Sequence, residues 1–364
     1  MPGLVPGIHA LLDFRCIKKD VDGRDKPGHD VERDEAAMKR ISLALLSFVV
    51  LAVGVSAQAQ DKFPSRPIKV EVPFGAGSAT DIVIRIVGEQ MRHELGQQIV
   101  VENKPGAFGI LAIEEMAKAR PDGYTLQVGN PGTNTLAPII YKSKFKIDYE
   151  NEVTMVTRLG EVPLVLVATT KDFAPKTYAE FITLAKANPG KVRYASVGIG
   201  SNNHYDTEAF AQWAGIQMVH IPNKGGGAAI TNDLVSGDAQ VGLVNAASSA
   251  GVIKGGLLKV LAVMADQRLP EYPDAPTLKE LGYANAKGLW SALYASSKTP
   301  PDVLETIHKA TVAALKSAPV QEAFKKQMIK AVPNASLADA KAWDVTERAY
   351  WKKLTETVKV ELPE

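Results

Sequence analysis

Five short segments rich in Gly, Ser, Thr and Asn carry the side chains that could hold a ligand. The first runs from Phe74 to Asp81, and the spacing Ser78-x-x-Asp81 is a capping-box pattern that predicts the start of a helix. Its glycines let backbone N–H groups approach a ligand closely. Because the first N–H groups of a helix have no partner inside it, such a start can bind an anion. Taken alone, the segment is equally consistent with a plain capped helix.

The other four segments have a similar composition and also follow predicted strands; they span 129–134, 198–204, 222–227 and 244–248. In open α/β sheets the carboxyl ends of the strands form the edge at which ligands bind. We therefore expect a small polar cleft, shared between two lobes and lined with hydrogen-bond donors.

Two ionisable residues in these segments could either bind the ligand or be ordinary side chains that have no part in binding. Lys224 stands beside Gly225, Gly226 and Gly227, where its ammonium could pair with a carboxylate, although loop lysines are more often simply solvated. His204 lies in the first turn of a predicted helix. For His204, a satisfied or solvent-facing side chain is the more common situation than a ligand contact.

The motifs of the common hydrolases and nucleotide-binding enzymes are absent. The sequence has no H-E-x-x-H, G-x-S-x-G or G-x-x-x-x-G-K-[ST] pattern. A Rossmann-type oxidoreductase is the enzyme alternative, because Gly75-x-Gly77-x-x-Thr80 and a later Glu102 approach a dinucleotide fingerprint. The third glycine is missing, and donors without a nucleophile or base favour binding over turnover. We expect no enzyme activity, no cofactor and no metal.

The elements that position these segments alternate between strands and helices. Strands are predicted at 68–74, 98–101 and 124–129, and helices at 80–95, with Gly96 as its C-terminal cap, and at 110–118. Such alternation predicts βαβ units and largely parallel sheets. The fold class is therefore α/β.

The second half of the chain continues the alternation and then becomes helical. Apolar runs at 162–168 and 259–264 resemble strands buried on both faces, and we expect them to be the two crossings between lobes. This assigns 60–162 plus 260–364 to lobe 1 and 163–259 to lobe 2. Further strands are predicted at 192–197, 218–221 and 241–245, a helix opened by the capping box at Thr177–Glu180, and helices at 301–316, 319–329 and 339–358.

Residues 38–59 have the three-part pattern of a secretory signal peptide. Met38-Lys39-Arg40 is a short basic region, and residues 41–55 are an apolar run of 15 residues, shorter than the roughly 20 that a membrane span needs. Ala57-Gln58-Ala59 places cleavage before Gln60, with Val55-Ser56-Ala57 as the near alternative. Residues 1–37, which hold the only cysteine, Cys16, are expected to be a mis-called upstream extension. The predicted location is the periplasm.

The charge of the chain argues against nucleic acid as a partner. The chain has 364 residues, 46% hydrophobic and 23% charged, and a formal net charge of +2. That charge is too small to indicate nucleic acid as a partner. We expect a monomer.

Several motifs together resemble the periplasmic solute-binding proteins of tripartite tricarboxylate transporters, the Bug family. The resemblance covers about residues 62–360. It is carried by the following segments: Phe63-Pro64-Ser65-Arg66-Pro67-Ile68, Val72-Pro73-Phe74 with Asp81, Val101-Glu102-Asn103-Lys104-Pro105-Gly106-Ala107, Pro121-Asp122-Gly123-Tyr124-Thr125-Leu126, Ala187-Asn188-Pro189-Gly190-Lys191 and Pro273-Asp274-Ala275-Pro276-Thr277.

The resemblance implies a type II periplasmic-binding-protein fold, two Rossmann-like lobes that close on a small organic acid. The ligand would be a di- or tricarboxylate, an aromatic acid or an amino acid, delivered to membrane transporter subunits. The ligand contacts implied by the family are Phe74, Gly77, Ser78, Ala79, Asp81, Asn130, Thr133, Gly200, Ser201, Asn202 and Lys224. The loop composition adds His204, Gly225 and Asn245 to the candidate site.

Two departures from the family pattern fall in the expected pocket. The first loop has Ala76-Gly77-Ser78 where Pro-Gly-Gly is usual, and Asn223 stands where a Tyr usually precedes the Lys-Gly pair. The resemblance therefore does not determine which acid this protein binds. A binding protein that presents its ligand to a sensor kinase is the other alternative to the transporter.

Overall fold

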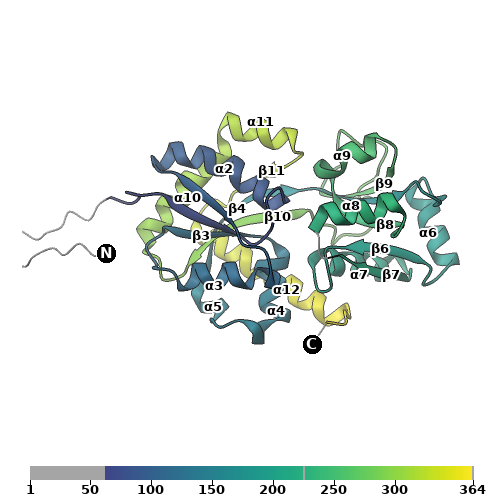
Figure 1. The fold of residues 1–364 in the computed structure, drawn as a ribbon, viewed down its shortest axis with the longest axis horizontal. Coiled ribbons are helices and arrows are strands. Elements are labelled where there is room, and N and C mark those ends of the chain that lie inside the picture. The colour runs from purple at the N-terminus through teal and green to yellow at the C-terminus, as the bar shows by residue number, and fades with distance from the viewer. Residues whose placement is uncertain (1–61, 224–225, 363–364) are drawn as a thin grey trace, which may run out of the picture. The chain divides into compact units, whose positions relative to one another are not determined.

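A computed structural model describes residues 62–223 and 226–362, which form two mixed β-sheets with helices on both faces of each (Figure 1). The first sheet has the strand order β11-β4-β10-β3-β1-β2, and the second has the order β7-β6-β8-β5-β9. The strands are β1 (Ile68–Val72), β2 (Ile99–Asn103), β3 (Thr125–Gly129), β4 (Val153–Val162), β5 (Leu164–Thr169), β6 (Val192–Ser196), β7 (Met218–Pro222), β8 (Val241–Asn245), β9 (Leu258–Met264), β10 (Leu289–Ser296) and β11 (Lys330–Ala331).

The helices connect these strands and cover the sheets. They are α2 (Ala79–Leu95), η1 (Ala107–Gly109), α3 (Ile110–Lys118), η2 (Pro131–Leu136), α4 (Ala137–Ile140), η3 (Lys142–Lys144), α5 (Tyr149–Glu152), α6 (Tyr178–Ala187), α7 (Asn202–Ala214), α8 (Gly226–Ser236), α9 (Ala246–Lys254), α10 (Pro301–Lys316), α11 (Ala318–Lys326) and α12 (Leu337–Thr357). The α/β class is confirmed. Gly96 ends α2 in the left-handed conformation, with φ of 67°, as its position predicted.

The sheets are less parallel than the alternation predicted. β1 pairs in parallel with β2 and β3, and β6 pairs in parallel with β7 and β8. The pairs that involve β4, β5, β9, β10 or β11 are antiparallel. Parallel neighbours need a crossover connection, usually a helix, whereas a strand that enters from the other sheet has no such constraint. The prediction of largely parallel sheets was therefore wrong for the strands near the crossings.

The first crossing between the sheets lies within the apolar run 162–168, where Pro163 separates β4 from β5. The second crossing was predicted wrongly. The run 259–264 is β9, which pairs with β5 inside the second sheet, and the chain returns to the first sheet only at β10. Leu278 and Tyr283 still pack in the core of the second sheet. Residues 260–286 therefore pack with the sheet of lobe 2. The prediction failed because an apolar run indicates burial on both faces but does not indicate which sheet the strand joins.

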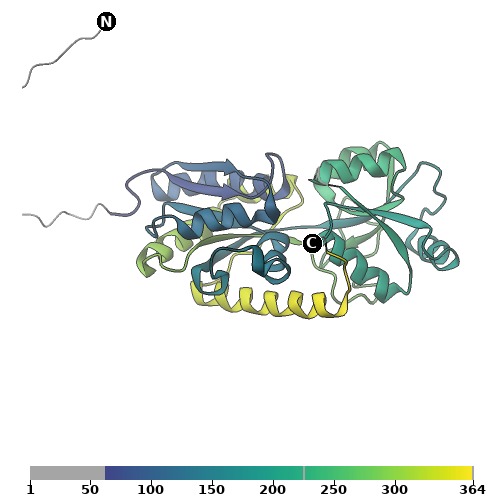
Figure 2. The same cartoon turned by 60° about the horizontal axis from the view of Figure 1, so that its bottom comes forward.

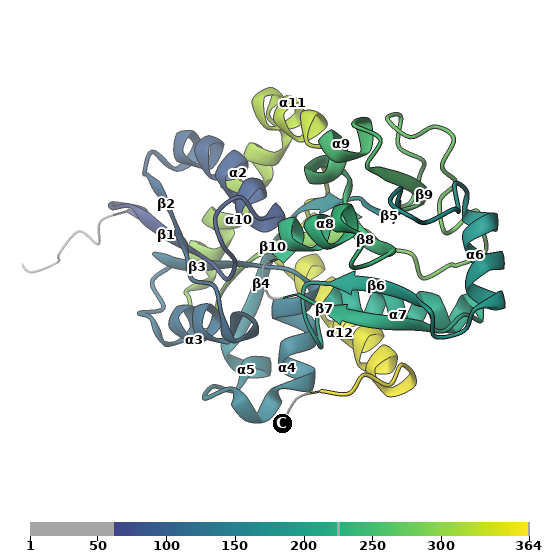
Figure 3. The same cartoon turned by 45° about the vertical axis from the view of Figure 1, so that its right-hand side comes forward.

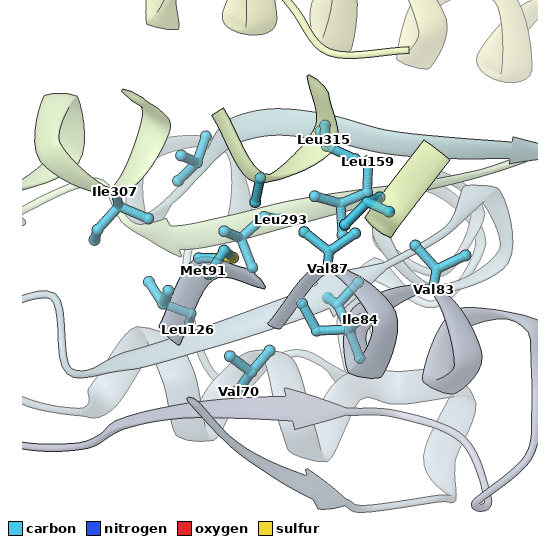
Figure 4. Close-up of a cluster of buried hydrophobic side chains, with 14 of the residues drawn as sticks. Val70, Val83, Ile84, Val87, Met91, Leu126, Leu159, Leu293, Ile307 and Leu315 are labelled. Carbon is cyan, nitrogen blue, oxygen red and sulfur yellow. The ribbon is translucent and has the colours of Figure 1, made fainter. Parts of the chain in front are cut away.

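Strand β10 separates the two cores of the first sheet. Leu293 and Ala295 point into the cluster formed with α2 and α10, part of which Figure 4 shows, while Trp290, Ala292 and Tyr294 point toward α3 and α12. This alternation follows from the two-residue repeat of a strand. The side chains of Val87, Met91 and Leu293 are fully buried in the first cluster.

Strand β5 has the same role in the second sheet. Leu164, Leu166 and Ala168 pack with residues of α6 and α7, whereas Val165 and Val167 pack with residues of α8. All six residues of β5 are buried. The prediction that this run is covered on both faces is confirmed.

The C-terminal end of helix α12, the long yellow helix in Figure 2, packs against segments that follow strands of both sheets. Trp351, Leu354 and Val358 form one apolar cluster with Leu136, which follows the loop after β3, and with Tyr205 of α7. The two loops that precede Leu136 and Tyr205 therefore share an apolar support.

None of the helices in the described part of the chain is both long enough and apolar enough to span a bilayer. The predicted signal peptide, the upstream extension and Cys16 lie outside the described residues.

Replacing Leu293 by Ala should lower the free energy of unfolding by about 2–5 kcal/mol, because the truncation leaves a cavity in a fully buried site. Denaturant unfolding followed by circular dichroism measures this change. The matched control is Leu257→Ala, at a side chain that is 47% exposed, which should cost less than about 0.5 kcal/mol. Equal losses in both variants would contradict the assignment of this core.

Candidate functional site

The first candidate loop, between β1 and α2, is held by Asp81. Both oxygens of the Asp81 carboxylate accept hydrogen bonds: Oδ2 from the Gly77 N–H at 2.9 Å, Oδ1 from Asn103 Nδ2 at 2.8 Å, and both from Arg85 Nε at 3.0 Å. Asn103 also donates to the carbonyl of Phe74 at 3.0 Å. Asp81 thus fixes the loop at Phe74 and Gly77, which it joins to β2.

The Asp81 carboxylate stays ionised in this setting. Burial alone raises its pKa, but the hydrogen bonds from Arg85, Gly77 and Asn103 outweigh it and hold the pKa below the usual value. Asp81 is only 2% exposed, so its oxygens are committed to the loop. The geometry favours a structural role over a direct ligand contact.

Ser78 caps α2, with its Oγ accepting from the Asp81 N–H at 3.3 Å, and Ala79 is the first residue of the helix. The predicted capping box is present in altered form, because the Asp81 side chain returns to the N–H of Gly77 rather than to that of Ser78. Gly77 has φ of 80°, a left-handed conformation that glycine adopts without strain.

The second loop, after β3, contains a reciprocal cap. Asn130 Oδ1 accepts from the Thr133 N–H at 3.2 Å, and Thr133 Oγ1 accepts from the Asn130 N–H at 3.2 Å. Behind them, the buried Asn134 exchanges hydrogen bonds with Gln127 of β3 at 2.9 and 3.1 Å. A Cβ on Gly129 would lie 1.8 Å from Asn134 Oδ1, so only glycine fits at the end of β3. The conformation of the loop is therefore held by hydrogen bonds of Asn130, Thr133 and Asn134.

The third loop, after β6, begins α7. Ser201 Oγ accepts from the His204 N–H at 3.3 Å, and His204 Nδ1 accepts from the Gly200 N–H at 3.2 Å. The imidazole ring of His204 stacks on that of His220 with centroids 3.7 Å apart. His220 Nε2 is in turn 2.6 Å from Ser196 Oγ. The two histidines therefore hold the backbone of this loop from behind.

The stacked histidines are uncharged at neutral pH. Burial lowers the pKa of His204 to about 3, with a further contribution from His220, and burial lowers the pKa of His220 to about 4. Neutral His204 can accept the Gly200 N–H bond, which a protonated imidazole cannot. The satisfied-histidine interpretation of His204 is the one that this geometry favours.

The fourth and fifth loops are only partly described. Asn223 receives the chain from β7, its N–H donating to the carbonyl of Ser196 at 2.9 Å, while Lys224 and Gly225 lie outside the described residues. Asn245 caps α9, with Oδ1 accepting from the Ser248 N–H at 3.1 Å. The helices that follow these two loops, α8 and α9, are labelled in Figure 3.

Contacts join the first three loops in a chain. A Cβ on Gly109, the residue before α3, would lie 2.7 Å from Thr133 Cγ2 and 3.2 Å from Pro73 Cβ, so the first and second loops meet there. A Cβ on Gly132 would lie 3.3 Å from Asn202 Oδ1, so the second and third loops meet although they follow strands of different sheets. The fourth loop joins the third through the bond from Asn223 to Ser196.

Two hollows in the described surface lie away from these loops. One, of about 280 Å³, lies at the end of α2 beside Arg92 and Gly96. The other, of about 530 Å³, lies between α7 and Val358. Neither is lined by a residue of the predicted site, so the predicted cleft stays a proposal. Among residues 62–223 and 226–362, no group of three or more His, Cys, Asp or Glu side chains is arranged to hold a metal ion.

Sequence reasoning missed two residues that organise the site. Asn103 belongs to the V-E-N motif, but nothing in its spacing indicated that it reaches back to Asp81 and Phe74. Gly109 carries the contact between the first two loops. The only available signal was its position just after Gly106 in a segment that precedes a helix.

Replacing Asp81 by Ala should lower the free energy of unfolding by about 1–3 kcal/mol, because the hydrogen bonds from Gly77 and Asn103 lose their buried acceptor. Thermal or denaturant unfolding measures the loss. Asp302→Ala, at the exposed first turn of α10, is the control and should cost no more than about 1 kcal/mol. A loss no larger than that of the control would show that Asp81 does not hold the loop.

The histidine pair predicts a specific dependence of stability on pH. As pH falls below about 6.5, the unfolded chain takes up protons on both imidazoles, while the folded chain stays unprotonated until about pH 4 to 3. Stability should therefore fall across that window. His220→Phe keeps a ring in the stack but removes one titrating group, so its melting temperature should fall less between pH 6.5 and 4 than that of the wild type. Parallel curves for the two proteins would rule out this linkage.

Comparison with known proteins matches residues 83–358 to the family described as tripartite tricarboxylate transporter family receptor. The chain is similar to protein BugT of Bordetella pertussis, with 32% identity over 287 residues that cover 78% of this chain and 87% of BugT.

Two solved structures from Rhodopseudomonas palustris share the fold. One, a protein with adipate, has a TM-score of 0.74 and 26% identity, covering 82% of this chain and 99% of the other. MatC with bound malate has a TM-score of 0.70 and 29% identity, covering 80% of this chain and 99% of MatC. With a family match over more than half of its length and 32% identity to BugT, of which it covers 87%, the chain belongs to the tripartite tricarboxylate transporter receptor family, the Bug solute-binding proteins.

Proposed function

We propose that this protein captures a small organic carboxylate and delivers it to the membrane subunits of a tripartite tricarboxylate-type transporter. The observation that carries the proposal is the meeting of the second and third loops at Gly132 and Asn202. Each loop follows a strand of a different sheet and opens a helical segment with its own side-chain cap. Helix starts that converge in this way supply backbone N–H donors suited to a carboxylate.

The side chains around these loops support binding over chemistry. The Asp81 carboxylate is occupied by Arg85, Gly77 and Asn103. The neutral His204 accepts from Gly200, and its ring is stacked on His220. A general base must reach the proton that it removes, and these two groups already have partners inside the protein. We therefore propose that the ligand is bound and released unchanged.

The ligand class is proposed from the chemistry of the loops together with the comparisons. Similar proteins of 26 and 29% identity were solved with adipate and malate, both dicarboxylates. A di- or tricarboxylate is the first choice for this chain, and an aromatic acid or amino acid remains within the proposed class. Carboxylates suit the donors at helix starts because both the N–H groups and the helix dipole favour negative charge.

The proposed setting is the periplasm, with the protein acting as a monomer. The signal-peptide pattern of residues 38–59 and the receptor role of the family support this setting. A ligand bound between the lobes would favour the closed arrangement by its higher affinity for that state. The closed protein would then be recognised by the transporter.

Differential scanning fluorimetry of the purified protein tests the function. The panel is succinate, malate, adipate, citrate, benzoate, aspartate and NADH, each at matched ionic strength. At least one small acid should raise the melting temperature in a concentration-dependent way, since a ligand at 100 times its Kd stabilises a protein by about 2.7 kcal/mol. Succinamide, which has the shape of succinate without its charge, is the control and should have no effect.

Stabilisation by NADH alone would overturn the proposal in favour of an oxidoreductase. In the same assay, Asp81→Ala should weaken binding of the stabilising acid, because the first loop loses its hydrogen bond at Gly77. Calorimetry with the same acid measures the change in Kd. An unchanged Kd would show that Asp81 does not support the binding site.

A further inference from the structure

The hydroxyl of Tyr141 is buried without a partner. Tyr141 directly follows α4 and is only 4% exposed. Its hydroxyl finds no hydrogen-bond partner among the residues that the structure describes. A buried polar group without a partner costs free energy, so such a group in a folded protein calls for an explanation.

This hydroxyl lies where the second and third loops approach each other. The helical segment η2–α4 leads from Asn130 to Tyr141, and a Cβ built on Gly200 would lie 3.0 Å from the Tyr141 hydroxyl oxygen. Gly200 precedes the cap of α7, and its N–H already donates to His204. The N–H of Gly200 is a donor and cannot accept a hydrogen bond from Tyr141.

A strained segment holds the ring of Tyr141 in place. The ring stacks on Phe108 with centroids 4.4 Å apart. Ala107 and Phe108 have φ of 46° and 54°, left-handed values that are costly for residues with a Cβ. Strained backbone of this kind clusters at ligand-binding sites. Phe108 is nevertheless 44% exposed, so the stacked pair of rings reaches the surface on the Phe108 side.

The surroundings favour a negatively charged acceptor. Burial raises the pKa of Tyr141, so the hydroxyl keeps its proton and acts as a donor at physiological pH. The ammonium of Lys144 lies 5.4 Å from the centroid of the same ring. A carboxylate accepts a stronger hydrogen bond from such a hydroxyl than a neutral acceptor does, and the nearby ammonium adds to the attraction for negative charge.

We propose that Tyr141 is a specificity residue whose hydroxyl donates to a second carboxylate of the ligand, the one farther from the helix starts. This inference rests on the proposed function and narrows it, because it selects dicarboxylates over monocarboxylates of the same length. A second acidic group supplies the acceptor that the protein itself does not provide. The first carboxylate remains with the capped helix starts.

Isothermal titration calorimetry with matched acids tests the inference. The probes are succinate, glutarate and adipate, each compared with butyrate, pentanoate and hexanoate. The wild type should bind one of the diacids at least about tenfold more tightly than its monoacid, a difference that one hydrogen bond to a charged group can supply. Tyr141→Phe should remove most of that preference. Its Kd for the monoacids should stay within about twofold of the wild-type value, because the monoacids do not use the hydroxyl and so lose no hydrogen bond.

The variant separates a ligand contact from a structural role. Tyr141→Phe should leave the melting temperature of the unliganded protein unchanged or slightly higher, because the hydroxyl has no partner to lose. Tyr178→Phe, at the outer helix α6, is the matched control and should keep the diacid preference. A lower melting temperature for Tyr141→Phe without ligand would assign the hydroxyl to the protein's own structure and overturn the inference.

The outcomes for the two proposals are distinct. If the wild type binds mono- and diacids equally, or if Tyr141→Phe keeps the preference, the specificity role fails and carboxylate capture stands. If the wild type binds none of the six acids, nor any acid of the wider panel, carboxylate capture fails and the role of Tyr141 fails with it.

Discussion

The start of a helix exposes backbone N–H groups that have no partner within the helix, and the arrangement of this protein's loops depends on how those groups are satisfied. At each of four helix starts one N–H is taken by a polar side chain of the chain itself, from Ser78, Asn130, Ser201 and Asn245. The cap fixes the entry of the helix but does not occupy every donor. A capped helix start therefore still has N–H donors that could bind an anion, which is why a cap alone could not separate the two interpretations.

The local features of this arrangement could be predicted from the sequence. Ser78 and Asp81 lie three residues apart, and that spacing alone predicted a capped helix with a polar loop before it. Gly96 and the boundaries of α3 and α10 follow from equally local rules. The continuous apolar run at β5 correctly predicted burial on both faces, because a strand with helices on each side needs apolar residues at every position.

The non-local part could not be obtained in the same way. β9 and β5 both show apolar runs, yet one of them is an edge strand of the second sheet, and the choice depends on pairing with residues about a hundred positions away. Likewise, the bonds from Asn103 to Asp81 and the stacking of His204 on His220 join different elements. The unpaired hydroxyl of Tyr141 is a property of packing and leaves no pattern in the sequence.

The last described residues of the chain contribute to the loop region. Val358 packs with Leu136 and Tyr205 in one apolar cluster, and Leu362 lies so close to Gly200 that a Cβ there would be 3.0 Å from Leu362 Cδ2. An extension fused to the C-terminus would therefore begin only two residues after a side chain that lies against the third loop, and a bulky C-terminal tag could interfere with ligand access there.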